Sequence, residues 1–293
     1  MVEEQSDTGL AITGATGAVG GRIASRLAGL GHRQRLIVRD GSRAPDLPGA
    51  GVVEASYEDP EAMRRALAGV RTFFMVSAGE THDRVRQHTA TVDAAVAAGV
   101  ERIVYLSFLG AGPQATFTFA RHHWWTEEHV RTTGLRHTFL RNSLYLDLLP
   151  VFTGSDGVIR GPAGDGRVAA VARDDIADVA VSVLLGEGHD GRTYDVTGPE
   201  AITLHEAAEE LSRFTGRPVT YHAETLEEAY AARASYGAPE WEVEGWVTSY
   251  VAIATGEMNV VSDTVSRLTG RAPMGLAEFL RRYPESYRHL ERA

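Results

Sequence analysis

The sequence predicts an α/β fold: a doubly wound parallel sheet with a smaller, mostly helical lobe toward the C-terminus. Two observations lead to this prediction. In the first half of the chain, short β-rich runs alternate with segments of helical periodicity, which is the pattern of a parallel sheet covered by helices on both faces. The first of these runs, residues 10–13, leads into a glycine-rich turn and an amphipathic helix, which is typical of a Rossmann-type domain.

The elements of the first half follow one another regularly. A helix after the glycine turn is expected to end near Gly29, and the next to start at Pro60 with Asp59 as its N-cap. Residues 72–77 are continuously apolar, as expected of a strand buried on both faces. The expected strands are residues 10–13, 35–39, 51–55, 72–77, 102–107 and 136–141, and the third and fourth helices cover about 81–98 and 116–130.

The pattern changes after Arg141. Residues 150–167 are rich in Gly, Pro and Asp and are interpreted as a loop insertion. Residues 167–185 then predict a strand followed by a helix that is capped near Asp174 or Asp175.

The remainder of the chain is interpreted as mostly helical. After a further strand at 192–198, Thr203 and Glu206 form the capping box of a helix. We therefore predict a dinucleotide-binding domain of residues 1–149, to which 168–197 return, and a smaller substrate-binding lobe of residues 150–167 and 198–293.

The composition excludes several classes of function. With 39 acidic and 29 basic residues, the formal net charge of −10 argues against nucleic acid as the main partner. No apolar run approaches the ~18 residues of a membrane span, and the polar, acidic N-terminus is unlike a signal peptide, so we expect a cytoplasmic protein. Cysteine is absent, which excludes disulfides, thiolate nucleophiles and cysteine metal sites. All 29 basic residues are arginine, so lysine chemistry is excluded too.

The glycine-rich turn carries the strongest functional signal. Gly14, Gly17 and Gly20 form a GxxGxxG pattern directly after a strand and at the start of a helix. Glycine permits both the tight turn and the close approach of a pyrophosphate to the backbone. The free N–H groups at the helix N-terminus then receive the anion. The turn therefore predicts a bound dinucleotide.

The residues after the second strand favour NADPH, with NADH as the alternative. Many NAD enzymes place an acidic residue here to bind the ribose hydroxyls. In this chain Arg39 follows Gly20 by 19 residues, and arginine suits the 2′-phosphate of NADPH. Arg43 is expected to assist. Asp40 leaves the NADH alternative open, because it could bind the ribose instead.

Several segments together resemble the atypical short-chain dehydrogenases of the NmrA-like type. They are "TGATGAVG", "LIVRD", "YLSFLGAG", "TEEHVRTTGLRHTFLRNSLYLD" and "VARDDIADVAVSVL". Within that family, the chain is most similar to the bacterial NAD(P)H quinone oxidoreductase and triphenylmethane reductase branch. The resemblance covers nearly the whole chain, and it is more specific than the glycine turn alone.

The resemblance implies a role for individual positions. Ser77 would line the nicotinamide ribose side, and Ser107 matches the serine that ends the fifth strand of short-chain dehydrogenases. Tyr145 would border the substrate pocket. His122, Ser107 and Tyr145 are the candidate catalytic residues. Ser56 stands where relatives commonly place an acidic residue near adenine, so that contact is in doubt. The residues implied to bind the cofactor at the turn are Thr13, Gly14, Thr16, Gly17, Ala18, Val19 and Gly20.

The usual acid pair of short-chain dehydrogenases is missing. Alignment with the family places the catalytic tyrosine position at Thr118 and the lysine position at His122. A simple ketone becomes a strongly basic alkoxide on hydride transfer and needs a positioned acid. A quinone or an extended aromatic cation gives a delocalised product that needs little proton assistance. The missing pair therefore favours such flat acceptors.

The helix around these positions is rich in histidine. His122 and His123 are both candidate proton donors, because histidine titrates near neutral pH. A metal site made by these two residues and His129 is not expected, since helical spacing separates the three rings. The adjacent Trp124 and Trp125 are interpreted as packing residues.

Two further groups of residues stand out in the sequence. Asp174, Asp175 and Asp178 resemble a carboxylate cluster but are best explained by a helix N-terminus, which favours acidic side chains. An aromatic pocket for a flat ligand could be formed by Phe152, Trp241, Trp246 and Tyr250.

The sequence thus favours an NADPH-dependent reductase that transfers hydride to a quinone or another flat aromatic acceptor, such as an aromatic polyketide prepared for oxygenation. The expected partner is this small substrate, with neither nucleic acid nor a membrane, and a homodimer is left open. The alternative is a non-catalytic NmrA-like regulator that binds the dinucleotide as a redox sensor. An isomerase or epimerase would lack an obvious acid–base pair.

Overall fold

The computed structural model describes residues 9–291, which form two compact units. The first unit comprises the described residues through Ser107, together with His123–Arg141 and Ala177–Tyr194. The second comprises Phe108–His122, Asn142–Ile176 and the described residues from Asp195 onward. The predicted division into a dinucleotide-binding domain and a substrate lobe concerns function and stays a prediction.

A seven-stranded sheet organises the first unit, in the order β3-β2-β1-β4-β5-β6-β9. The pairs β3–β2, β2–β1, β1–β4 and β4–β5 are parallel. The strands are β1 (Leu10–Thr13), β2 (Gln34–Val38), β3 (Ala50–Glu54), β4 (Thr72–Val76), β5 (Arg102–Phe108), β6 (Arg136–Asn142) and β9 (Arg192–Val196). Strands β1 to β3 are added toward one edge of the sheet, and the strands from β4 onward are added toward the other edge. Doubly wound sheets bind ligands at the carboxyl ends of the strands where the order changes in this way, here between β1 and β4.

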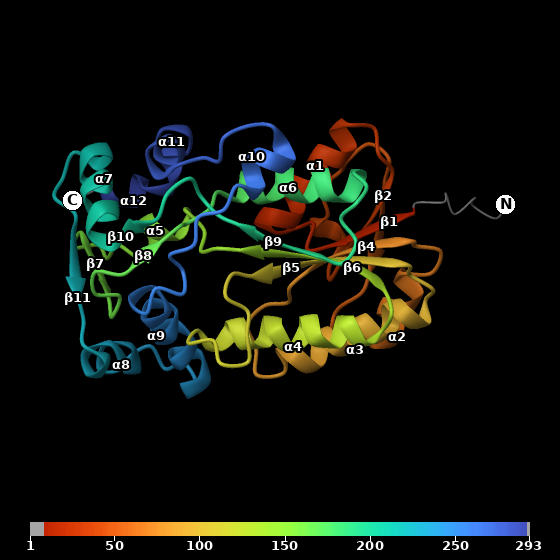
Figure 1. The fold of residues 1–293 in the computed structure, drawn as a ribbon, viewed down its shortest axis with the longest axis horizontal. Helices are drawn as coiled ribbons and strands as arrows, with labels where there is room; N and C mark the ends of the chain where they lie inside the picture. Colours follow the sequence, from red (N-terminus) through yellow and green to blue (C-terminus); the bar gives the residue numbers. More distant parts are fainter. Residues whose placement is uncertain (1–8, 292–293) are drawn as a thin grey trace. The chain divides into compact units, whose positions relative to one another are not determined.

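Helices cover both faces of this sheet. In Figure 1, α1 (Ala18–Gly29) and α6 (Arg173–Leu185) lie on one face, and α2 (Pro60–Ala66), α3 (Arg84–Ala97) and α4 (Thr118–Thr132) lie on the other. The Asp59 side chain accepts a hydrogen bond from Ala62 N, so the predicted N-cap of α2 is confirmed. Fully buried side chains from the strands and α3 fill the layer between sheet and helices: Phe73, Met75, Val92, Ile103, Tyr105 and Phe139.

A buried carboxylate on α4 ties this helix to the sheet. Glu127 is fully buried and accepts hydrogen bonds from Ser107 Oγ at 2.6 Å and from two nitrogens of Arg141 at 2.8 and 2.6 Å. Arg131 adds a contact of 3.1 Å to the second carboxylate oxygen. Both oxygens are therefore satisfied, as a buried charge requires.

The second unit is built from short strands and helices. Its elements are α5 (Leu148–Val151), β7 (Val158–Gly161), β8 (Arg167–Val168), β10 (Ile202–Thr203), α7 (Leu204–Thr215), β11 (Thr220–Ala223), α8 (Leu226–Ala234), α9 (Glu240–Ala254), α10 (Thr264–Thr269), α11 (Leu276–Arg282) and α12 (Arg288–Glu291). The predicted capping box is confirmed, because Thr203 and Glu206 exchange hydrogen bonds at the start of α7.

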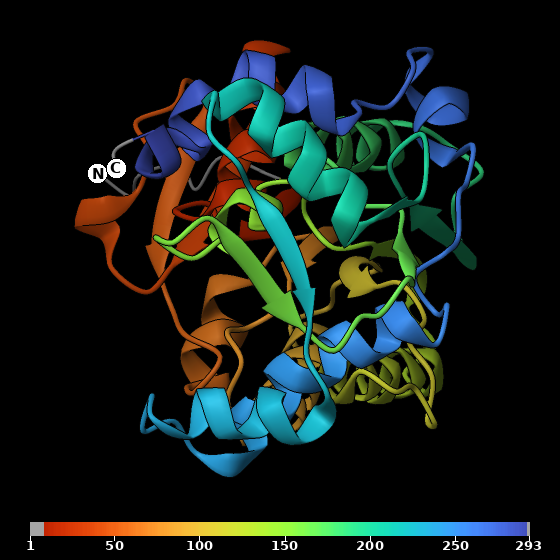
Figure 2. The same ribbon diagram turned by 90° about the vertical axis from the view of Figure 1, so that its left-hand side faces the viewer.

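The predicted loop insertion at 150–167 is wrong for part of its length. Strand β7 lies within it and pairs in parallel with β11, side by side in Figure 2. Gly, Pro and Asp flank β7, so the segment has the composition of a loop. Its partner strand lies about sixty residues farther along the chain. A strand stabilised by so distant a partner leaves little local signal.

We expect Gly20→Ala to destabilise the protein by at least about 2 kcal/mol, because overpacking against rigid backbone is poorly relieved. A Cβ atom at Gly20 would lie 2.3 Å from the carbonyl oxygen of Gly14. Gly29→Ala is the matched control in the same helix, since a Cβ there meets nothing within 4 Å. It should be neutral or stabilise by up to about 1 kcal/mol. Urea unfolding of both variants measures the difference, and equal stabilities would contradict the expectation.

Candidate functional site

A cavity of about 290 Å³ lies in the first unit, at the carboxyl ends of the central strands. The glycine turn after β1 forms one wall, and the residues that follow β2, β3 and β4 form the others. Of the sequence-predicted cofactor residues, Thr13, Gly14, Thr16, Gly17, Arg39 and Ser77 line it. Ala18, Val19, Gly20 and Arg43 are not among the lining residues, and Ser56 is. These assignments to a cofactor stay predictions.

The geometry of the glycine turn fits a dinucleotide. Gly14 has a φ of +69°, and a Cβ atom there would lie 3.0 Å from Val76 Cβ. The Gly17 N–H donates to Gly14 O at 2.9 Å and closes the turn. Helix α1 then begins at Ala18 with no side-chain cap and no acidic residue in its first turn. Its first N–H groups are thus available to an anion.

A hydrogen-bonded chain links the turn to the strands beside it. Thr13 Oγ1 accepts from Val76 N at 2.9 Å and lies 2.7 Å from the hydroxyl of Tyr57. The Tyr57 hydroxyl in turn donates to the carbonyl of Val76. Burial raises the pKa of Tyr57, because the phenolate would lose its hydration. Tyr57 therefore stays protonated and acts as a hydrogen-bond donor in the cavity wall.

The two charged residues after β2 have different surroundings. Arg39 lines the cavity. Asp40 instead caps the short 3-10 turn Gly41–Arg43, where its carboxylate accepts from Ser42 N at 3.0 Å and Ser42 Oγ at 2.6 Å. These hydrogen bonds, the hydroxyl first, lower the pKa of Asp40. The carboxylate of Asp40 is thus engaged by the turn.

The loop after β4 is held by two residues of α3. The Ala78 N–H donates to His88 Nε2 at 2.8 Å, and Arg84 Nε donates to the Ala78 carbonyl at 3.0 Å. His88 is fully buried and Arg84 is 4% exposed. A backbone N–H can only donate, so His88 Nε2 must be unprotonated. Both backbone groups of Ala78, a residue of the cavity wall, are therefore fixed by side chains.

His88 and Arg84 together form a clamp on Ala78, and residues of the histidine-rich helix α4 contact both of them. The Nδ1 atom of His123 lies 2.8 Å from the Tyr105 hydroxyl, and its Nε2 atom lies 3.3 Å from Arg84 Nη2. Thr126 Oγ1 lies 2.9 Å from His88 Nδ1. Burial raises the pKa of Tyr105, so this hydroxyl also stays protonated. His123 is thus part of a buried polar network in the first unit.

The predicted catalytic residues occupy three different settings. Ser107 is buried and donates to Glu127. In the second unit, His122 is half-buried and its ring lies 5.5 Å from that of Phe119. Tyr145 is half-buried beneath the guanidinium of Arg173, at 4.6 Å from the ring centroid. None of the three lines the cavity, and their catalytic roles stay predictions.

The aspartates near the start of α6 have structural partners. Asp175 accepts from Arg271 Nη1 at 2.6 Å and from Met274 N at 2.7 Å, and Asp174 accepts from the Tyr283 hydroxyl at 2.6 Å. Asp178 pairs with Arg26. Among residues 9–291, no group of three or more His, Asp or Glu side chains is placed to hold a metal ion. No helix in the same range is long and apolar enough to cross a membrane.

Three of the four predicted pocket aromatics come together. Phe152, Trp246 and Tyr250 line a second cavity, which lies in the second unit. Trp241 instead lies 6.0 Å from the ring of Phe119 and packs against the hydrophobic core. Tyr236, which the sequence analysis did not identify, completes the aromatic lining.

Comparison with known proteins identifies the family. Residues 14–187 match a family described as NAD(P)H-binding. The chain belongs to this family. It is also 37% identical to the (4-alkanoyl-5-oxo-2,5-dihydrofuran-3-yl)methyl phosphate reductase of Streptomyces griseus, over 94% of this chain and 98% of that protein.

Two solved structures resemble the chain over most of its length. One is the NADPH-dependent quinone oxidoreductase of Escherichia coli complexed with NADPH, with a TM-score of 0.86, 34% identity, and coverage of 93% of this chain and 99% of that one. The other is the triphenylmethane reductase of Citrobacter sp. complexed with NADP(H), with a TM-score of 0.83, 32% identity and the same coverage. The predicted fold, family resemblance and class, an NAD(P)H-dependent oxidoreductase, are confirmed.

Sequence reasoning missed Tyr57, which lines the cavity, and His88, which holds the lining residue Ala78. Tyr57 follows β3 by three residues, so its place near a strand end was a usable signal. His88 had no such signal, because the segment around it reads as the solvated face of a helix. Only the fold brings its ring to the backbone of Ala78.

We expect His88→Phe to raise the KM for the dinucleotide about 3- to 10-fold and to lower stability by about 1–3 kcal/mol, because the Ala78 N–H loses its acceptor. In His88→Gln the amide oxygen can replace Nε2, so both quantities should recover to near the parent values. Steady-state kinetics and urea unfolding measure the two effects. A KM unchanged in His88→Phe would show that the clamp does not position the loop.

Proposed function

We propose that the protein is an NADPH-dependent reductase that transfers hydride to a quinone or another flat, electron-poor aromatic acceptor. The observation that carries this proposal is a dinucleotide cavity in a chain without the Tyr/Lys acid pair. Thr118 and His122 stand at those two positions, and the chain has no lysine. The similarity to a quinone oxidoreductase and a triphenylmethane reductase supports the same class of acceptor.

The residues after β2 support NADPH rather than NADH. Arg39 lines the cavity with a guanidinium that suits a 2′-phosphate. The carboxylate of Asp40, which would otherwise bind ribose hydroxyls, is engaged by Ser42. The quinone oxidoreductase of Escherichia coli was also solved with NADPH.

When bound, the dinucleotide would supply a hydride. A quinone gains this hydride and one proton, whereas a triarylmethane cation gains the hydride alone. The glycine turn would bind the pyrophosphate through the N–H groups of α1. The clamp on Ala78 would hold the wall beside it, and Ser77 would face the nicotinamide ribose. The proton can come from water, because a hydroquinone anion is delocalised and weakly basic. Acceleration then depends on holding the two reactants in the right orientation.

A conjugated lactone is the second candidate acceptor. The Streptomyces griseus relative, at 37% identity, is named as the reductase of an acyl-substituted dihydrofuranone phosphate. Hydride addition to such a conjugated system also gives a delocalised anion between two carbonyl groups. Both classes of acceptor therefore require the protein to orient the nicotinamide and the acceptor, and neither requires a strong acid.

We also propose a cytoplasmic location. The net charge of −10 disfavours a nucleic acid partner. A small aromatic substrate is the partner that we propose, and a homodimer stays open.

The decisive assay follows NADPH oxidation against quinones, a triarylmethane dye, conjugated lactones and simple aliphatic ketones. Quinones and the dye are expected to react and the aliphatic ketones to be inert. Reaction of simple ketones with quinones inert would overturn the proposal. Tight NADPH binding with no oxidation against the whole panel would favour the non-catalytic redox sensor.

Arg39→Gln should raise the KM for NADPH about 10- to 100-fold and change that for NADH little, because it removes a charge-assisted contact to the 2′-phosphate. Arg33→Gln is the control: Arg33 is also exposed but precedes β2, at the opposite end of the strand. Steady-state kinetics with both cofactors test the change. Equal losses with NADPH and NADH would remove the role assigned to Arg39.

A further inference from the structure

A cavity of about 490 Å³ in the second unit shares no lining residue with the dinucleotide cavity. Residues at the end of α5, in β7 and in helices α8 and α9 form its walls. Cavities of this size commonly hold small molecules of a few rings. Its aromatic lining consists of Phe152, Tyr236, Trp246 and Tyr250.

Large apolar side chains with unusually high exposure line this cavity. Tyr236 is 68% exposed and Val151 is 66% exposed, the two highest values among the large apolar side chains of residues 9–291. The ring of Tyr236 lies 6.1 Å from that of Trp246, at 60° between their planes. Scattered exposed apolar side chains are ordinary, whereas apolar side chains gathered around one cavity indicate a surface that a ligand covers.

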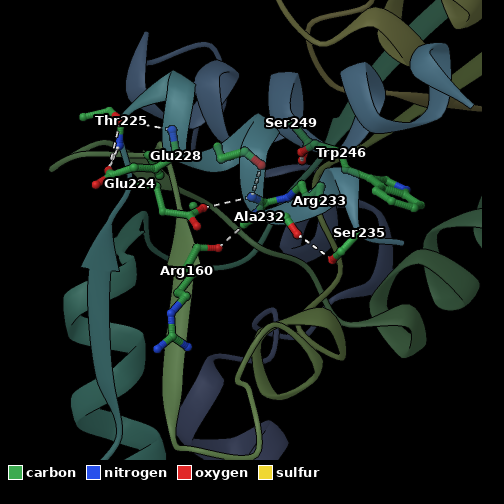
Figure 3. Close-up of polar contacts among 12 residues, drawn as sticks. Arg160, Glu224, Thr225, Glu228, Ala232, Arg233, Ser235, Trp246 and Ser249 are labelled. Carbon is green, nitrogen blue, oxygen red and sulfur yellow. Dashed lines mark hydrogen bonds and ion pairs between the residues drawn. The ribbon is translucent and has the colours of Figure 1, made fainter. Parts of the chain in front are cut away.

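A buried ion pair forms the polar part of the wall. Arg233 Nη1 donates to Glu224 Oε2 at 2.9 Å, and the two side chains are only 11% and 5% exposed. As Figure 3 shows, Arg233 also reaches the backbone of β7, where it donates to Arg160 O at 3.3 Å. A further bond to Ala229 O measures 2.8 Å. Arg233 is therefore held by one carboxylate and two backbone carbonyls.

Glu224 keeps one acceptor for a ligand. Its Oε2 atom is bound by Arg233, whereas no donor among residues 9–291 is within hydrogen-bond distance of Oε1. The other cation of the wall, Arg160, is held by two hydrogen bonds to Asp156, at 3.1 and 2.7 Å. Both guanidinium groups thus already face carboxylates. The cavity offers a charged acceptor, and an anion placed beside it would be repelled.

We propose that this cavity binds a flat aromatic molecule that carries an O–H or N–H donor, as phenols, hydroquinones, hydroxyquinones and arylamines do. The aromatic side chains contact the rings, and the donor completes the hydrogen bonding of Glu224 Oε1. A hydrogen bond to a charged acceptor contributes more than one to a neutral acceptor, so the donor decides selectivity. Binding here is independent of the reductase activity and is measured without NADPH.

Isothermal titration calorimetry of the full-length protein with three probes of matched shape tests the selectivity. We expect 2-naphthol to bind with 1:1 stoichiometry. The affinities of 2-methoxynaphthalene, which lacks the donor, and 2-naphthoate, which is an anion, should be at least about tenfold lower. No binding of 2-naphthol, or equal affinity for 2-naphthol and 2-methoxynaphthalene, would overturn the proposal.

Two neighbouring alanines on α8 locate the binding site. Ala232 lines the cavity and is exposed, so Ala232→Phe fills the space without disturbing the core. Ala231→Phe is the matched control, because Ala231 is exposed on the same helix and does not line the cavity. Ala232→Phe should weaken 2-naphthol binding at least about tenfold and Ala231→Phe hardly at all. Equal affinities in the two variants would place the ligand elsewhere.

Glu224→Gln tests the acceptor itself. The amide keeps the size of the side chain but removes its charge, so the discrimination against 2-naphthoate and 2-methoxynaphthalene should shrink several-fold. Retention of the parent selectivity would overturn the role of Glu224. Circular dichroism confirms that the variant is folded, and a loss of 2-naphthol binding with the fold intact would also support the role of Glu224 as the acceptor.

Discussion

The close approach of Gly20 to the carbonyl of Gly14 fixes where helix α1 starts, and the cavity at the carboxyl ends of the central strands is organised around that start. Only a residue without Cβ fits, since the added atom would lie 2.3 Å from a backbone oxygen. Because the helix packs so closely, its first N–H groups lie at the carboxyl end of β1. The positive end of the helix dipole is thereby placed beside the cavity wall.

The wall formed after β4 depends on a different kind of constraint. The loop after β4 has no strand beside it, so its backbone groups need other partners. His88 and Arg84 supply them for Ala78, and His123 and Tyr105 hold Arg84 and His88 in turn. Such buried networks are favourable only when their members are satisfied together. His88 and His123 are therefore explained by the loop that they fix.

Much of the first unit could be predicted from the sequence because its signals are local. The glycine turn, the apolar run of β4 and the Asp59 cap each depend on neighbours within a few residues. The strand β7 and the ring of His88 could not be predicted, since each is stabilised by a partner distant in the sequence or visible only in the fold. The aromatic cavity was partly predicted: residue type suggested Trp246 and Tyr250, whereas Tyr236 is found only from its position.

Because the chain has no lysine, no lysine cation can lower the pKa of a tyrosine. In ordinary short-chain dehydrogenases a lysine cation lowers the pKa of the catalytic tyrosine. Here burial raises the pKa of Tyr57 and Tyr105, and the Tyr57 hydroxyl is committed to the carbonyl of Val76. A phenol with a raised pKa transfers its proton reluctantly near neutral pH. Tyr57 and Tyr105 are thus suited to hold the structure around the cavity rather than to protonate an alkoxide, which is why an acceptor with a weakly basic product matches the chain best.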